Sequence, residues 1–351
     1  MTPDEARSLF PVLERTAYLN AGTFGPLARP TAEAVGAQVH ADLRDGRIGK
    51  AYFERTLALR AEVRAQLAAL VAADPEQVAL TTSTTDGCNI VLGGLDLRPE
   101  DEVVTTTDEH FGLLGALHVS GARVVVAAPE PETILAAVTP RTRLLALSHV
   151  LWTTGRTLPV RELREHTGLP ILVDGAQSVG AVPVEAAGID FLTISGQKWL
   201  CGPDATGGLV VADPERLRIA RPSFFSQRGY EPSGSFEPAP GAARFDVGWI
   251  ATGALAGLEA ALRLPPEWRF ERAAEQAHRC RELLDGVVEL VPGDATLVSF
   301  RAEDPPALTA SLAEAGVAVR EIPGTGLVRA SCGWWTNEDD LTHLAAALAE
   351  T

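Results

Sequence analysis

The chain has 351 residues, 46% of them hydrophobic and 22% charged, which is the composition of a globular protein with a large core. Its formal net charge of -16 opposes binding to nucleic-acid phosphates or anionic lipids, so we expect no nucleic-acid partner and no membrane association. Its four cysteines lack C-x-x-C spacing, which favours neither a zinc site nor a disulfide framework, and we expect no metal. The N-terminus has no apolar leader segment, and we expect a cytoplasmic protein.

Between Gln77 and Ala212 the chain alternates short β-rich runs with helical or loop segments. These runs are nearly continuous in apolar residues, as strands buried on both faces of a sheet must be. The predicted strands are Val78–Thr81, Glu102–Thr106, Arg123–Ala127, Arg143–Ser148, Ile171–Asp174, Phe191–Ser195 and Gly208–Ala212. Strands joined by crossover segments predict an α/β fold with a mostly parallel seven-stranded sheet, helices on both faces, and a ligand site beyond the carboxyl ends of the strands.

A second unit is predicted after a Gly-, Pro- and Ser-rich stretch at residues 223–243. Its expected helices are Thr252–Leu264, Glu267–Leu290, Pro306–Ala315 and Asn337–Ala349, the last with Thr336 or Asn337 as N-cap. Its expected strands are Thr296–Phe300, Val317–Arg320 and Leu327–Ser331. We therefore expect a large domain of residues 17–252 and a small α+β C-terminal domain of residues 253–351, with the N-terminal arm, residues 1–16, packing near the small domain.

Two neighbouring strands end in side chains that can carry out chemistry. One ends in Asp174, and the next is followed closely by Lys198, one of only two lysines among 30 basic residues. A lysine that persists against such a bias is typical of imine chemistry, because guanidinium is a poor nucleophile. Pyridoxal-5′-phosphate (PLP) enzymes need a lysine that forms a Schiff base with the cofactor and a carboxylate that keeps the pyridine nitrogen protonated. The alternative is that Asp174 caps a helix and Lys198 is a loop residue.

Two further segments follow predicted strands. The run Thr81–Asn89 is rich in hydroxyls and leads into a helical pattern, which is typical of a phosphate site at a helix N-terminus, or simply of an N-cap. His110 could lie on a cofactor ring and assist proton transfer. A single histidine after a strand, His110 or His149, is more often a structural hydrogen-bonding residue.

Seen together and in order, these segments resemble the class V aminotransferase superfamily of fold-type I PLP enzymes, which includes cysteine desulfurases, kynureninase-like lyases and isopenicillin N epimerase-like proteins. The resemblance covers nearly the whole chain, and Val173–Gln177 and Ser195–Lys198 are its most specific parts. The opening Asn-x-Gly-x-Phe-Gly at residues 20–25 looks most like the epimerase-type branch. The other matching segments are residues 83–89, 109–110, 148–155, 244–248 and 328–331.

The resemblance implies a role for each matching residue. The implied cofactor-binding residues are Thr84, Thr85, His110, Asp174, Gln177, Ser195, Gln197 and Lys198. Three of them are also the implied catalytic residues: Lys198 carries the cofactor, Asp174 holds the pyridine nitrogen and His110 stacks on the ring. Both threonines and Ser195 would bind the phosphate, and Gln177 would contact the 3′-oxygen.

The implied substrate-binding residues are Asn20 and Arg329. Arg329 matches an arginine that grips the substrate α-carboxylate, a task that suits a bidentate guanidinium. The alternative for Arg329 is a salt bridge at the domain interface.

Four features depart from the desulfurase pattern. Gln197 stands where desulfurases commonly have a histidine, so only an amide contact with the phosphate would persist. Trp152 replaces an asparagine that would reach the 3′-oxygen, and Trp249 replaces a threonine that would reach the phosphate across a dimer interface. The segment 320–329 is short and contains no cysteine, whereas desulfurases carry a nucleophilic cysteine on a loop there. Persulfide formation on this chain is therefore not expected.

The resemblance further implies a homodimer that acts on a small amino-acid substrate. The substrate amine would displace Lys198 from the cofactor, and Lys198 would then remove the Cα proton as general base. We favour a lyase that eliminates a group from Cβ or Cγ, such as a C–S lyase. An aminotransferase or amino-acid epimerase is the alternative. A catalytically silent PLP-fold binding protein is a remote alternative, because the chain keeps both Lys198 and Asp174.

Overall fold

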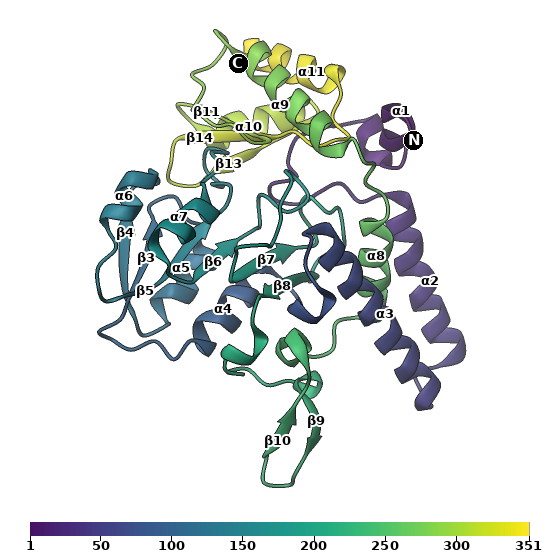
Figure 1. Ribbon diagram of the computed structural model, residues 1–351. Coiled ribbons are helices and arrows are strands. Elements are labelled where there is room, and N and C mark those ends of the chain that lie inside the picture. The colour runs from purple at the N-terminus through teal and green to yellow at the C-terminus, as the bar shows by residue number, and fades with distance from the viewer. Residues whose placement is uncertain (351) are drawn as a thin grey trace.

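The computed structural model describes residues 1–350, and its largest feature is a seven-stranded sheet (Figure 1). In sheet order the strands are β2 (Val78–Thr81), β8 (Gly207–Val211), β7 (Phe191–Ser195), β6 (Ile171–Asp174), β5 (Thr142–Ser148), β3 (Glu102–Thr106) and β4 (Arg123–Ala127). Strand β8 runs antiparallel to both neighbours, and the other neighbouring pairs are parallel. The predicted α/β sheet is confirmed, with one-residue shifts in the ends of β5 and β8.

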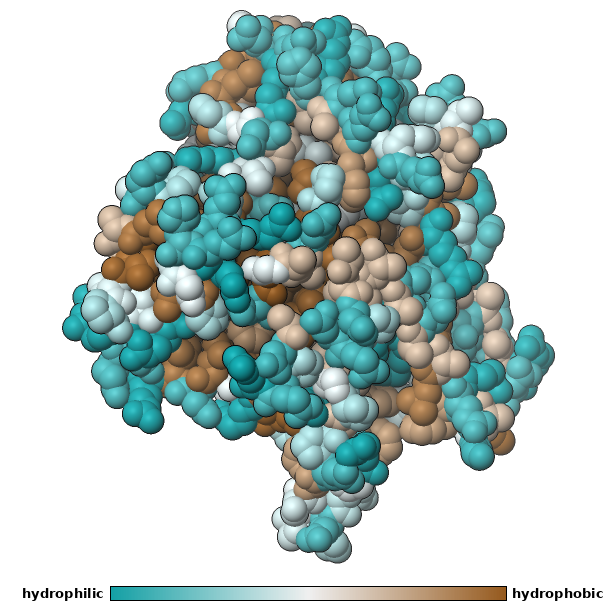
Figure 2. All heavy atoms as spheres, viewed as in Figure 1, coloured by the Kyte–Doolittle hydropathy of each residue, from teal (hydrophilic) through white to brown (hydrophobic). Residues whose placement is uncertain are grey.

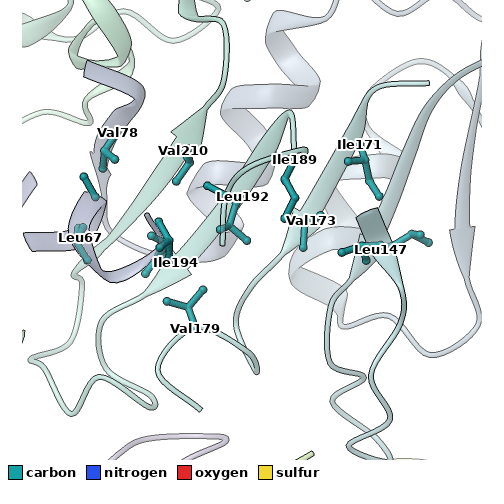
Figure 3. Packing of buried hydrophobic residues seen from close by; sticks show 14 of the residues in the cluster. Leu67, Val78, Leu147, Ile171, Val173, Val179, Ile189, Leu192, Ile194 and Val210 are labelled. Carbon is teal, nitrogen blue, oxygen red and sulfur yellow. The ribbon is translucent and has the colours of Figure 1, made fainter. Parts of the chain in front are cut away.

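Alternate residues of the central strands point to opposite faces of this sheet, and each face has its own hydrophobic core. In β6, Ile171 and Val173 join one core, which is covered by the first group of helices below, while Leu172 joins the other. Figure 3 shows the first core, where Leu147, Val173 and Ile194 lie along one side of neighbouring strands. The helices of the first face are α3 (Gly49–Leu70), α6 (Pro131–Ala136), α7 (Val160–Thr167) and α8 (Thr252–Leu262), and those of the second are α4 (Thr84–Gly94) and α5 (Phe111–His118). Helix α2 (Arg29–Asp45) packs on α8.

The C-terminal part has a third core around a three-stranded antiparallel sheet. Its elements are α9 (Arg269–Leu284), β11 (Leu297–Arg301), α10 (Pro305–Glu314), β12 (Val317–Ala318), β13 (Arg320–Ile322), β14 (Leu327–Ser331) and α11 (Glu338–Ala349), and Asn337 is the N-cap of α11. The expected helix to Leu290 was too long, because the chain turns at Gly286 with φ +75°. The expected strand Val317–Arg320 was wrong as one element, because β12 and β13 pair with different strands. The domain division stays a prediction, and Thr351 lies outside the described residues.

The N-terminal arm, from here on taken as all residues before α2 (residues 1–28), lies against this C-terminal part. It contains α1 (Pro3–Arg7) and β1 (Ala17–Tyr18), and β1 pairs in parallel with β12. Arg7 donates two hydrogen bonds to Asp340, which lies in the first turn of α11. Phe10 packs on Trp334 and Trp335 with ring centroids 5.4 and 5.7 Å apart. Helix α2 then carries the chain away from the C-terminal part, alongside α8 (Figure 1).

A hairpin of β9 (Gln227–Tyr230) and β10 (Phe236–Pro238) projects from the body, and Figure 2 shows it standing clear of the rest of the visible face. Because an isolated two-stranded hairpin is at best marginally stable in water, the two strands contribute little stability by themselves. The 3₁₀ helices within residues 1–350 are η1 (Pro11–Glu14), η2 (Pro75–Gln77), η3 (Pro214–Arg216), η4 (Phe224–Ser226) and η5 (Gly241–Phe245). No helix in that range is long and apolar enough to cross a bilayer.

A buried ion cluster fixes the strand that leads to the expected phosphate site. Asp246 is 2% exposed and lies 2.7 Å from Arg60 and 2.8 Å from Arg64, both on α3. It also accepts a hydrogen bond from the backbone of Leu80 in β2 at 2.8 Å. The cluster thereby ties α3, β2 and the segment after η5 together.

We predict that Asp246→Ala lowers the free energy of unfolding by about 3–5 kcal/mol, because Arg60 would stay buried without its counter-charge. Denaturant unfolding of the cofactor-free protein measures this loss. Glu289→Ala is the matched control: Glu289 pairs with Arg301 and the two side chains are 73% and 58% exposed, so the loss should stay below about 1 kcal/mol. Equal losses in the two variants would contradict the argument.

Candidate active site

The polar residues predicted from the sequence gather at one edge of the large sheet. Strands β3, β5, β6 and β7 are parallel neighbours, and β2 runs in the same direction because the antiparallel β8 separates it from β7. Their carboxyl ends therefore share one edge, which is where ligands of such sheets bind. Asp174 ends β6, Lys198 lies in the turn after β7, and His110 follows β3.

Lys198 has a desolvated amine beside a carboxylate. Burial lowers its pKa to about 8, Asp174 partly offsets this, and Arg329 and Arg320 lower it further. Within residues 1–350 the amine makes no hydrogen bond or ion pair at contact distance. Such an amine is about half neutral near pH 8, and the neutral form is the nucleophilic state.

Asp174 is 3% exposed, and one of its carboxylate oxygens is held by its own surroundings. That oxygen accepts hydrogen bonds from the Ala176 backbone at 2.9 Å and from the Thr193 hydroxyl at 3.3 Å. Residues 176–178 form a turn, so Asp174 does not cap a helix, which removes one alternative reading of the sequence. The second oxygen has no hydrogen-bond partner in the described part of the chain, so it can accept a hydrogen bond from a ligand.

The hydroxyl-rich segment forms the first turn of α4. Ser83 is the N-cap, and its hydroxyl accepts a hydrogen bond from the Asp86 backbone at 3.1 Å. The capping position is thus filled by Ser83, which leaves the side chains of Thr84 and Thr85 for a ligand at the positive end of the helix. The other two expected phosphate contacts are bound to each other, since the hydroxyl of Ser195 donates to the side-chain oxygen of Gln197 at 2.8 Å.

His110 caps α5 with its ring. The Nδ1 atom accepts a hydrogen bond from the Gly112 backbone at 3.0 Å, so in the neutral ring the proton lies on Nε2. Trp152 lies edge-on to this ring, with centroids 5.0 Å apart. Burial of the ring and the positive charge of Lys198 lower the pKa of His110 below its usual value, so the neutral imidazole predominates at pH 7.

Arg329 is a buried cation without a carboxylate partner among residues 1–350. It is 2% exposed, donates one hydrogen bond to the Trp152 carbonyl at 2.5 Å, and its Nε has no partner there. The expected alternative, a salt bridge, is therefore absent from that range. Burial and the charge of Arg320 lower the pKa of Arg329 to about 9. An unpaired buried guanidinium is unfavourable, so this position suits a ligand anion.

The arm reaches Arg329 from the other side. Asn20 bridges to Ser331 on β14, and its side-chain oxygen is buried without a partner in the described chain. A Cβ on Gly22 would lie 2.6 Å from Arg329, and a Cβ on Gly25 would lie 2.1 Å from the Lys198 carbonyl. Both positions require glycine because the arm runs directly over the two functional residues.

The amide of Gln177 is engaged within the protein. Gln177 donates a hydrogen bond to the Gly22 carbonyl at 2.8 Å and accepts one from the Trp199 indole at 3.0 Å, so its amide ties the arm to the segment after Lys198. Its expected contact with the 3′-oxygen stays a prediction. Trp249 is 55% exposed and packs in a surface cluster with Phe53, Phe224 and Phe225.

Sequence reasoning missed two residues of the site. Arg320 lies opposite Arg329 in the β13–β14 register, and its charge lowers the pKa values of Lys198, His110 and Arg329. The short Pro-Gly-Thr-Gly turn between the strands indicates a hairpin, but it does not fix the register that places the two arginines opposite each other. Glu109 is 4% exposed and lies next to His110 in the chain, and nothing in its sequence context signals burial. The described residues hold no cluster of three or more His, Cys, Asp or Glu that could bind a metal ion.

Comparisons with known proteins agree on one family. The family described as class-V aminotransferases matches residues 46–326. Isopenicillin N epimerase of Streptomyces clavuligerus is 31% identical over 98% of this chain and 97% of its own, and a cysteine desulfurase of Escherichia coli is 30% identical over 84% and 79%. Two structures of the cystine C–S lyase C-DES align over 98% and 97% of this chain and 99% of their own. One is a variant with glycine covalently linked to the PLP cofactor (TM-score 0.92, 29% identity), and the other holds the reaction product cysteine persulfide (0.91, 30%).

The site fits PLP on its own geometry. A partly neutral amine, a carboxylate oxygen without a partner and a helix N-terminus with two available hydroxyls lie along one edge of the sheet. Lys198 would hold the aldehyde carbon, Asp174 the ring nitrogen, and Thr84 and Thr85 the phosphate.

We predict that borohydride reduction of the PLP-loaded protein fixes the cofactor to Lys198, as peptide mapping by mass spectrometry would show. Lys50, whose side chain is 88% exposed, should stay unmodified. For the cofactor-free protein, the rate of attachment should rise with pH through about 8, because the lowered pKa of Lys198 makes the neutral amine available there. Lys198→Arg should fold and show no attachment; an adduct on Lys50 would overturn the assignment.

Proposed function

Since the chain belongs to the class-V aminotransferase family and is a PLP-dependent enzyme, we propose that it is a lyase that eliminates a sulfur leaving group from Cβ of an amino acid with two carboxylates. One observation carries this proposal. Arg320 and Arg329 face each other across neighbouring strands, and the charges of both act on Lys198. A disulfide amino acid such as cystine offers two carboxylates to two such cations. The similarity to a cystine C–S lyase over nearly the whole chain supports the same substrate class.

Each step of the proposed reaction uses different residues of the chain. Arg329 binds the α-carboxylate and orients the Cα–H bond, and Asn20 closes the site from the arm. When bound, PLP supplies an aldehyde for the substrate amine and a ring that accepts electrons. Asp174 keeps the ring nitrogen protonated, and Lys198, once released, takes the Cα proton as general base. Because its pKa is about 8, the Lys198 ammonium can then return this proton to the departing sulfur.

Arg320 would select the substrate by binding the distal carboxylate. Within residues 1–350 its side chain donates one hydrogen bond, from Nε to the Glu321 carbonyl at 3.1 Å, and no carboxylate forms an ion pair with it. With cystine and water, elimination would give cysteine persulfide, pyruvate and ammonia, which balances the atoms of the reaction.

We predict that the enzyme forms pyruvate and ammonia from cystine, and that Arg320→Gln lowers kcat/KM for cystine about 10–100-fold, which corresponds to the roughly 1.5–3 kcal/mol of a hydrogen bond to a charged group. The same variant should turn over β-chloroalanine, which has one carboxylate, nearly as well as the wild type. Product assays on both substrates test this. Interconversion of L- and D-amino acids without keto-acid release would instead establish an epimerase, and transfer of the amino group to a keto acid would establish an aminotransferase.

The cysteines support a lyase without an enzyme-bound persulfide. Segment 320–329 contains no cysteine, and the four thiols are between 0% and 3% exposed. Burial raises the pKa values of Cys88 and Cys201, which disfavours the thiolate. Cys332, the nearest in sequence to Arg329, lies in the C-terminal core together with Cys280.

We therefore predict that Cys→Ser variants at the four positions lose stability but keep pyruvate formation. Mass spectrometry of the intact chain during turnover should show no added sulfur on the protein. A variant that folds and binds PLP but cannot turn over, together with a wild-type persulfide, would identify a desulfurase with a relocated nucleophile.

We also propose that the protein is a homodimer in the cytoplasm and that its large domain ends at residue 252. The projecting hairpin and the exposed aromatic cluster around Trp249 support a second copy at that surface, because neither is covered by the described part of the chain.

A further inference from the structure

Glu109 is a buried carboxylate that the mechanism above does not use. It is 4% exposed and accepts hydrogen bonds from the Ser148 backbone at 3.0 Å, the Ser148 hydroxyl at 2.5 Å and the Thr106 hydroxyl at 2.8 Å. Three donors that converge on two oxygens form a cradle for the ionised group, because a carboxylate accepts and does not donate. Thr106 ends β3 and Ser148 ends β5, so Glu109 joins the ends of two strands.

This cradle lies beside the expected cofactor-binding carboxylate. Ser148 pairs in register with Asp174, and the next residue in the chain after Glu109 is His110. The titratable groups that act on Glu109 or feel its charge are Asp174 on β6 and Cys88 on α4. Among residues 1–350 no Lys, Arg or His forms an ion pair with Glu109.

Two opposing effects act on the charge of Glu109. Burial raises its pKa to about 7, the hydrogen bonds from Ser148 and Thr106 lower it, and the negative charge of Asp174 raises it. The geometry of the cradle thus suits the anion, while the environment leaves the anion half populated near pH 7. A cation placed on Asp174 would remove part of the repulsion and shift Glu109 to its ionised form.

We propose that Glu109 is a positioning residue of the cofactor site, which releases its proton to solvent when the cofactor ring binds and then supports, as a second carboxylate, the positive ring nitrogen held by Asp174. The same hydrogen bonds hold the β3 end that carries His110. This inference rests on the proposed role of Asp174, and it does not depend on which reaction the loaded enzyme catalyses.

The sign of the linkage follows from the direction of the shift. The cofactor-free protein holds a proton on Glu109 below about pH 7, and the loaded protein does not. PLP affinity should therefore increase as the pH rises from about 6 to 8, with one proton released per site in the acidic part of this range. At pH 7 the release should be roughly half a proton, because a group with that pKa is half protonated.

Calorimetry of PLP binding in buffers with different ionisation enthalpies measures this proton release directly. Glu109→Gln keeps the size of the side chain and removes the titration, so it should release roughly half a proton less than the wild type at pH 7 and show a flatter dependence of Kd on pH. Ser148→Ala keeps the carboxylate but removes one donor to it, so the release should move to higher pH.

Glu102→Gln is the matched control. Glu102 is 1% exposed and begins β3, at the end of the strand away from Glu109, where Arg141 and Arg123 pair with it. This variant should bind PLP with wild-type proton release. A purely structural role for Glu109 would lower the melting temperature of Glu109→Gln and leave proton release unchanged, which would overturn the proposal. If proton release were unchanged in Glu109→Gln while the wild type formed pyruvate from cystine, the proposal for Glu109 would fail and the lyase assignment would stand. The two proposals can therefore fail separately.

Discussion

The chemistry of this protein depends on the desolvation of charged groups at one edge of a sheet. Lys198, Arg329 and Glu109 are each shifted in pKa mainly because water is excluded from them, to about 8, 9 and 7. Each shift favours the neutral form of its group; the charge of Asp174 opposes the shift of Lys198, and hydrogen bonds oppose that of Glu109. Lys198 and Glu109 are therefore close to changing protonation state near neutral pH, which is what proton transfer at a substrate carbon requires.

The C-terminal sheet brings two cations to this edge, and the arm lies over it. The C-terminal sheet presents Arg329 and Arg320 from neighbouring strands, and the arm passes over both Arg329 and the Lys198 turn at two glycines. Trp152 links the C-terminal sheet to His110, because its carbonyl accepts a hydrogen bond from Arg329 and its ring packs on His110. The proposed substrate-binding and cofactor-binding residues are thus connected through one loop after β5. Loss of the arm contacts at Arg7 or Phe10 would disturb the site without touching a catalytic group.

The comparisons and the local geometry answer different questions. Relatives with about 30% identity include an epimerase, a desulfurase and a C–S lyase, so family membership fixes the cofactor and not the reaction. The reaction depends on what surrounds the substrate side chain. The surroundings that we propose here are a second arginine and an indole ring, and segment 320–329 contains no cysteine. A desulfurase-type nucleophile would need one of the buried thiols to become exposed and ionised.

The sequence by itself determined the sheet, the two residues Asp174 and Lys198 and the capping segment at Ser83–Thr85, because continuous apolar runs and the residues directly after them are local signals. It could not determine the partners of those residues. Gln177 turned towards the arm, and Arg320 joined Arg329 only because an antiparallel register placed them opposite each other. The helix after Glu267 ended early at a left-handed glycine, and Glu109 became a titrating group only through burial beside Asp174. Strand and motif follow from neighbours in the chain, whereas charge state and recognition follow from neighbours in space, which only the tertiary structure supplies.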